Sequence, residues 1–95
     1  MEINLFESVG AFAENKDIAR GLRINSIIPT LNRNEEVILN FDKIESATQS
    51  FIHALISDVI RANGIEALDK ITFKNCNDKI KKIIEIVVEY MQAHS

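Results

Sequence analysis

The sequence predicts an α/β domain with a small, mainly parallel sheet of three to four strands and three helices. Two observations predict this class. Short strand-like apolar segments alternate with longer segments whose apolar residues recur at helical spacing. The resulting order is strand, helix, strand, helix, strand, helix, which implies parallel strands joined by right-handed crossovers. The 95 residues, 46% of them hydrophobic, suffice for a single small domain spanning residues 1–95.

The first strand is expected at residues 1–6, where apolar and polar residues alternate. Residues 10–15 read as a connection with room for a second short extended piece. Asn15 can accept hydrogen bonds from the free amides of a helix start, so the first helix should begin after it. Pro29 lacks an amide and clashes with the turn before it, so it should kink or end this helix.

The second strand is expected at residues 37–41, and its density of apolar residues fits a strand covered on both faces. After a polar junction, the second helix should run to about Asn63, before Gly64. Its core positions follow the i, i+3, i+4, i+7 pattern: Ile52, Leu55, Ile56 and Val59. A third strand at residues 71–73 precedes the last helix, which Asn77 can cap.

Composition narrows the function classes. The net charge of −3 argues against a nucleic-acid partner, because such binding depends on Lys and Arg releasing counterions from phosphates. No stretch approaches the roughly 18 apolar residues of a membrane span. The start of the chain does not resemble a secretory signal. Cys76 is the only cysteine and reads as a small buried thiol, so a cytoplasmic location is expected.

No residue spacing indicates catalysis, a metal or another cofactor. The three glycines are scattered, so no phosphate-binding loop is expected. A Ser50, His53 and Asp58 set has the residue types of a hydrolase, but nothing in the sequence supplies an oxyanion hole or a substrate pocket. The expectation is therefore a protein that is not an enzyme.

The junction before the second helix contains the candidate site. Ser46 and Gln49 match a capping box, in which the Ser46 hydroxyl accepts from the Gln49 amide and the Gln49 side chain accepts from the Ser46 amide. Ser50, His53, Ser57 and Arg61 follow the spacing i, i+3, i+7 and i+11, which places them on one helix face. Every surface helix has a polar face, but this one follows a strand, and ligands of open parallel sheets meet the carboxyl ends of strands.

The last helix has more apolar residues than one buried face needs: Ile86, Val88 and Tyr90 fall outside its main stripe. They indicate either a helix buried on several sides or a second contact surface for a homodimer or another protein. The second reading gives the alternative function, a structural or assembly subunit that oligomerises through its C-terminal helix.

Several segments resemble the STAS-like domain family of unknown function from bacterial and phage-related proteins. The matching residues are Ala19, Leu22 and Arg23, then residues 37–42, then Ile44, Ser50 and Phe51. The similarity extends from about residue 10 to residue 91. It implies a single STAS-like domain with βαβαβα order, similar to the STAS domains of anti-sigma factor antagonists.

The resemblance implies a signalling regulator that works by exchanging protein partners. In the antagonists, an ATPase of the histidine-kinase-like fold phosphorylates a serine at the start of the corresponding helix, and the complex then breaks. Here Asn40 stands where the antagonists usually have Asp. Gln49 occupies the phosphoacceptor position, so Ser50 and Thr48 are the candidate phosphorylation sites.

The leading expectation is therefore a cytoplasmic protein-binding module that lacks catalytic activity. Its partner would be such an ATPase or another signalling or defence protein encoded nearby. The expected partner-binding residues are Ser46, Thr48, Gln49, Ser50, His53 and Ser57.

Overall fold

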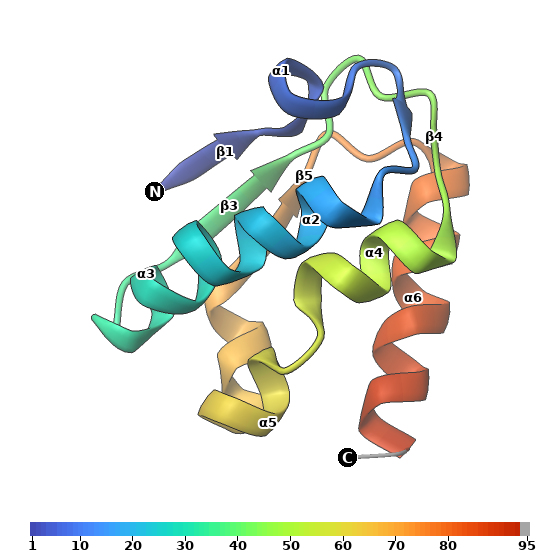
Figure 1. The fold of residues 1–95 in the computed structure, drawn as a ribbon. Helices are drawn as coiled ribbons and strands as arrows, with labels where there is room; N and C mark the ends of the chain where they lie inside the picture. The colour runs from blue at the N-terminus through green and yellow to red at the C-terminus, as the bar shows by residue number, and fades with distance from the viewer. Residues whose placement is uncertain (94–95) are drawn as a thin grey trace.

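Three parallel strands form the main sheet of the computed structural model, which describes residues 1–93. They are β1 (Glu2–Asn4), β3 (Val37–Asn40) and β5 (Ile71–Lys74), in the order β1-β3-β5. Glu2 lies opposite Ile38, and Val37 lies opposite Ile71. A separate two-stranded parallel ladder joins β2 (Phe12–Ala13) to β4 (Ser46–Ala47). The α/β class and the parallel pairing are both confirmed (Figure 1).

Helical segments make up most of the rest of the chain. They are α1 (Leu5–Val9), α2 (Lys16–Leu22), the π-helical η1 (Arg23–Ile27), α3 (Ile28–Asn32), α4 (Gln49–Ile56), α5 (Val59–Asn63), the 3₁₀ η2 (Ile65–Lys70) and α6 (Asp78–Ala93). Asn15 caps α2 by accepting from the amides of Asp17 and Ile18 at 3.0 and 3.2 Å. Asn77 caps α6 by accepting from the Ile80 amide at 2.9 Å. Both predicted caps are confirmed.

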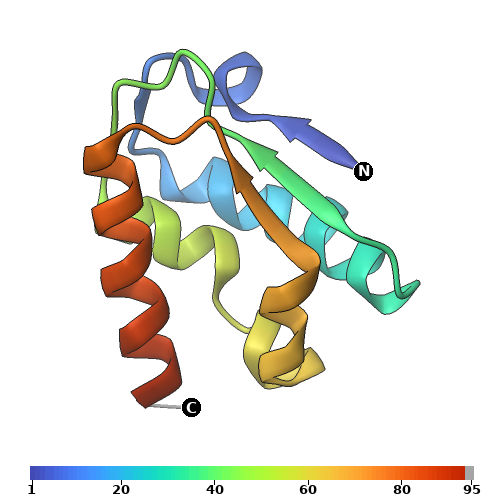
Figure 2. The same ribbon diagram turned by 180° about the vertical axis from the view of Figure 1, so that it is seen from behind.

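The sheet is covered by helices on one face only, so the prediction of a strand covered on both faces is wrong. Val37 and Leu39 are fully buried, whereas Ile38 and Asn40 on the opposite face of β3 are partly exposed. Helices α2 and α4 lie on the buried side, and Figure 2 shows the other face without a covering helix. Polar residues such as Glu2 and Thr72 flank Ile38 there, which explains why this face tolerates water.

One expected element boundary in the N-terminal half is wrong. The first strand stops at Asn4, and Leu5 starts α1 instead of continuing the strand. Pro29 was expected to kink or end its helix; it does not end it, since the helical path continues through α3 to Asn32. The backbone widens into the π-helical turn η1 just before Pro29. Such π turns are a usual way for a helix to accommodate a local irregularity.

The capping box at Ser46 is also wrong. Ser46 belongs to β4, whose pairing with β2 holds it in an extended conformation. The helix begins later, and Thr48 is its N-cap, with its Oγ1 accepting from the Phe51 amide at 3.0 Å. The predicted helix to Asn63 is interrupted at Ser57 and Asp58, where Asp58 has a φ of 64°. This backbone conformation is incompatible with a continuous α-helix.

The core lies between the sheet and α2, α4 and α6. The predicted stripe Ile52, Leu55, Ile56 and Val59 is buried without exception. Helix α4 packs against α2 on one side and α6 on the other. None of the helices in residues 1–93 has the length and hydrophobicity that a bilayer-spanning segment needs.

Candidate functional site

Helix α4 presents its polar residues to solvent. Its inner side contributes Phe51, Ile52 and Leu55, all fully buried. This packing fixes the rotation of the helix, so the residues between them must face outward. Gln49, Ser50 and His53 are exposed, as is the N-cap Thr48 just before the helix, and Ser57 at its end is partly exposed.

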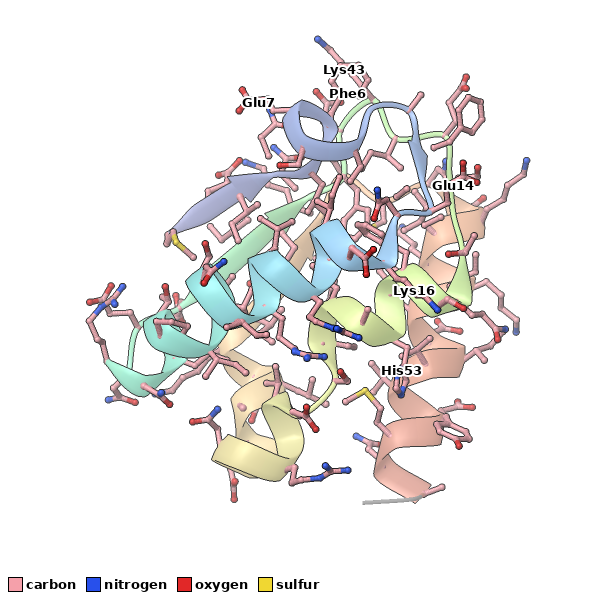
Figure 3. The ribbon with its side chains drawn as sticks, viewed as in Figure 1. Phe6, Glu7, Glu14, Lys16, Lys43 and His53 are labelled. Atoms are coloured by element: carbon pink, nitrogen blue, oxygen red, sulfur yellow. The ribbon has the colours of Figure 1, made fainter. Side chains whose placement is uncertain are left out.

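A cavity of about 600 Å³ opens beside this face, between α2, α4 and α6. We call it the α4 pocket. Its lining residues are Lys16, Arg20, Arg23, Gln49, Ser50, His53, Ala54, Ser57, Ile86, Val87 and Tyr90. Figure 3 shows the side chains of Lys16 and His53 on the same side of the molecule, with Lys16 at the start of α2 and His53 on α4.

The structure brings four of the six predicted partner-binding residues into this pocket: Gln49, Ser50, His53 and Ser57. The other two, Ser46 and Thr48, line a separate and smaller hollow of about 250 Å³ with Phe12, Ala13 and Glu14. The split follows from the fold, because Ser46 is part of the β2–β4 ladder and precedes the helix. The predicted surface is therefore two adjoining surfaces.

One wall of the α4 pocket is basic. Lys16 and Arg20 are exposed, and Arg23 is mostly covered. Among the described residues that line the pocket, none is an Asp or Glu. The pocket is thus locally positive, although the chain carries a net charge of −3. Outside the pocket lining, the carboxylate of Asp58 lies 3.9 Å from the Arg23 guanidinium.

Arg23 also supports the end of α4. Its side chain is 12% exposed. Its Nη1 donates to the carbonyl oxygen of Ala54 at 3.1 Å and to the hydroxyl of Ser57. A cation at a helix C-terminus satisfies carbonyls that have no partner within the helix and interacts favourably with the helix dipole. Arg23 therefore belongs to both the pocket wall and the framework that shapes it.

The opposite wall of the pocket comes from α6. Ile86 and Tyr90 are 39% and 55% exposed, and both line the α4 pocket. Val88 is instead partly buried against the core. The rings of His53 and Tyr90 meet edge to face with centroids 6.3 Å apart. Two of the three surplus apolar residues therefore extend the α4 surface and do not form a separate face.

Two further reactive groups lie outside the lining of the α4 pocket. The carboxylate of Asp58 contacts Arg61 at 3.1 Å as well as Arg23. Cys76 is partly buried, and burial raises the pKa of its thiol while the Lys81 ammonium opposes that shift. Within residues 1–93 no group of three or more His, Cys, Asp or Glu side chains is arranged to hold a metal ion.

The basic wall is absent from the site predicted from the sequence. Lys16, Arg20 and Arg23 are separated by four and then three residues, which places them on one face of a helix. Ile86 and Tyr90 show the same spacing of four on α6. These spacings could have indicated a basic face on one helix and an apolar face on another. Only the tertiary fold brings the two faces together beside α4.

A family model for the STAS-like domain of unknown function (DUF4325) matches residues 21–81. This segment contains η1, α3, all of β3, β4, α4, α5 and β5, and the start of α6. Comparison with curated proteins gives no match, and comparison with solved structures gives none either. Because the matched segment covers more than half of the chain and the parallel α/β fold agrees with it, the protein belongs to the STAS-like domain family of unknown function.

Proposed function

We propose that this protein is a cytoplasmic regulatory module that binds a partner protein through α4 and catalyses no reaction. The observation that carries the proposal is the two-sided character of α4. Its apolar side is sealed in the core, while Gln49, Ser50 and His53 stand exposed on a rigid helix. Because the backbone of a packed helix is already ordered, binding does not have to order it, which favours recognition.

The proposed docking surface consists of Ser46, Thr48, Gln49, Ser50, His53 and Ser57, together with Ile86 and Tyr90 from α6. The added pair supplies the apolar and aromatic contact that interface centres usually contain. By resemblance to anti-sigma factor antagonists, the partner is an ATPase of the histidine-kinase-like fold or a neighbouring signalling or defence protein, exchanged with others in a partner switch.

The test is a binding measurement between this protein and a purified ATPase of the histidine-kinase-like fold. We expect Ser50→Glu and His53→Glu together to weaken the complex at least about tenfold, because interface charges without partners cost this much or more. Asn4→Glu with Thr72→Glu places the same two charges on the open face of the sheet and serves as the matched control. Equal affinity of the α4 double variant and the unmodified chain would rule out this surface.

Phosphorylation of Ser50 or Thr48 would act on this surface by charge. A phosphate adds about two negative charges, and a helix start favours negative charge. We therefore expect phosphorylation to preserve the helix and to alter docking. Circular dichroism of Ser50→Glu should match that of the unmodified protein, and a loss of helical signal would contradict this mechanism.

The second candidate function is an assembly subunit that pairs through α6. It is favoured by the exposure of Ile86 and Tyr90, large apolar side chains that a second copy would cover. Light scattering over a concentration series distinguishes the two functions. A monomer at all concentrations excludes assembly, whereas a dimer that dissociates in Ile86→Glu would support it.

A further inference from the structure

The charge of the α4 pocket identifies what kind of group the partner brings. Lys16, Arg20 and Arg23 converge on it from one side, and none of its described lining residues carries a negative charge. Arg23 contacts the Asp58 carboxylate at 3.9 Å, whereas among the described residues Lys16 and Arg20 form no ion pair, although the whole chain has a net charge of −3. Complementary potentials across an interface are the rule, because like charges brought together cost several kcal/mol.

The pocket has the size and the mixed lining of a recognition site. Its volume of about 600 Å³ lies within the range of roughly 300–1,000 Å³ that is usual for ligand pockets. Hydroxyls of Ser50 and Ser57 and the imidazole of His53 lie between the basic wall and the apolar wall. An anionic group can therefore bind near α2 while an attached apolar group packs against Ile86 and Tyr90.

We propose that the α4 pocket receives an acidic segment of the partner, a side chain bearing a phosphate or carboxylate beside an aromatic or aliphatic one. This inference rests on the proposed protein-binding function. Arg23 is held by Ala54 and Ser57, so its guanidinium is a fixed positive charge. Lys16 and Arg20 are exposed and free to reorient toward an incoming anion.

The first experiment uses the protein alone. Phenyl phosphate, which joins an anion to a ring, is titrated into ¹⁵N-labelled protein and followed by NMR. We expect amide shifts concentrated at Lys16, Arg20, Ser50 and His53, with weaker binding of inorganic phosphate and none of benzyl alcohol. Added salt should weaken the binding, since exposed charges are screened. Shifts spread evenly over all lysines, or equal binding of benzyl alcohol, would overturn the proposal.

Matched charge variants sharpen the result. Lys16→Gln with Arg20→Gln should weaken phenyl phosphate binding about tenfold, because two charge-assisted contacts are lost. Lys79→Gln with Lys82→Gln removes the same charge from exposed positions outside the pocket and should change affinity by less than about twofold. Similar losses in the two double variants would mean that only net charge matters and would overturn the site.

The second experiment uses the purified ATPase and separates this inference from the function on which it rests. If the Glu variants of Ser50 and His53 weaken the complex and the Gln variants of Lys16 and Arg20 do so too, the partner supplies the anion. If only the former weaken it, the partner docks without an acidic group and the inference fails while the function stands. If neither does while phenyl phosphate still binds, the pocket serves a free small anion, and the assignment to a partner is overturned.

Discussion

The guanidinium of Arg23 donates a hydrogen bond to the carbonyl oxygen of Ala54 over 3.1 Å. This contact joins the end of α2 to the last turn of α4, next to the point where the chain leaves the helix at Ser57. Two distant segments are thereby fixed at the floor of the α4 pocket. Arg23 is one of the residues that carry the family resemblance. In this structure its side chain holds the end of α4 in place.

Arg23→Ala should lower the free energy of unfolding by about 2 kcal/mol, because hydrogen bonds from a charged donor are lost and a carbonyl is left without a partner. The Nε of Arg23 is buried with no hydrogen-bond partner among the described residues, so removing this donor offsets part of the loss. Urea unfolding measures the change. Arg20→Ala, an exposed position one turn earlier, is the control and should be nearly neutral. Equal losses would show that Arg23 does not fix α4.

Thr48→Ala should cost about 1 kcal/mol of stability, because the Phe51 amide loses the acceptor that caps α4. Thr48→Ser keeps the hydroxyl and should recover most of this. Ser46→Ala should change stability by less than about 0.5 kcal/mol, since Ser46 lies in β4 and does not cap the helix. Thermal unfolding of the three variants checks the assignment. A larger loss of stability in Ser46→Ala than in Thr48→Ala would indicate that Ser46 caps the helix.

Asn40→Asp should destabilise the protein by on the order of 1 kcal/mol at neutral pH. The Asn40 Nδ2 donates to a carboxylate oxygen of Glu2 at 2.8 Å, while its Oδ1 accepts from the Asp42 amide and from Asn75. A carboxylate would keep the acceptor and lose the donor, which explains why an amide is suited to this position. Unfolding in urea at pH 7 measures the effect. Adding Glu2→Gln supplies a new donor and should rescue the variant; a double variant no more stable than the single one would argue against this pairing.

Cys76 should react slowly with iodoacetamide in the folded protein. Burial raises the pKa of its thiol above the ordinary value of 9.0, and Lys81 partly opposes the shift. The folded state thus holds its proton to higher pH than the unfolded state. Its contribution to stability is complete below pH 9.0 and declines as the pH rises through the raised pKa. The rate profile of the folded protein should lie at higher pH than that of the urea-unfolded chain, and Lys81→Gln should move it further up; coincident profiles would contradict the burial effect.

Local patterns in the sequence were sufficient for most of the architecture. Helical periodicity found the buried side of α4, and Asn15 and Asn77 were recognisable as caps because they precede apolar stripes. The break at Asp58 could not be anticipated in the same way. Its left-handed backbone occurs at a residue that is neither Gly nor Asn, and Arg23 and Arg61, which contact its carboxylate, come from different elements.

Only part of the candidate site could be predicted from the sequence, for a similar reason. Helical spacing correctly placed Ser50 and His53 on one face of α4, and Ser57 just after the helix joins them. Arg61, predicted for the same face, lies on α5 beyond the break and does not line the pocket. The basic residues of α2 and the apolar residues of α6 join that face through packing. The start of α4 was misplaced because the β2–β4 pairing overrides the local capping preference of Ser46.

The strand pairing has a consequence for how quickly the native state forms. Glu2 pairs with Ile38 and Val37 with Ile71, so neither ladder joins neighbouring segments of the chain. Loop-closure entropy must be overcome before either ladder contributes a single hydrogen bond. A chain this rich in helix should consequently reach its native state more slowly than a helical bundle of equal length. The three-residue β1, held only at one edge, is the segment whose amides should exchange with solvent first.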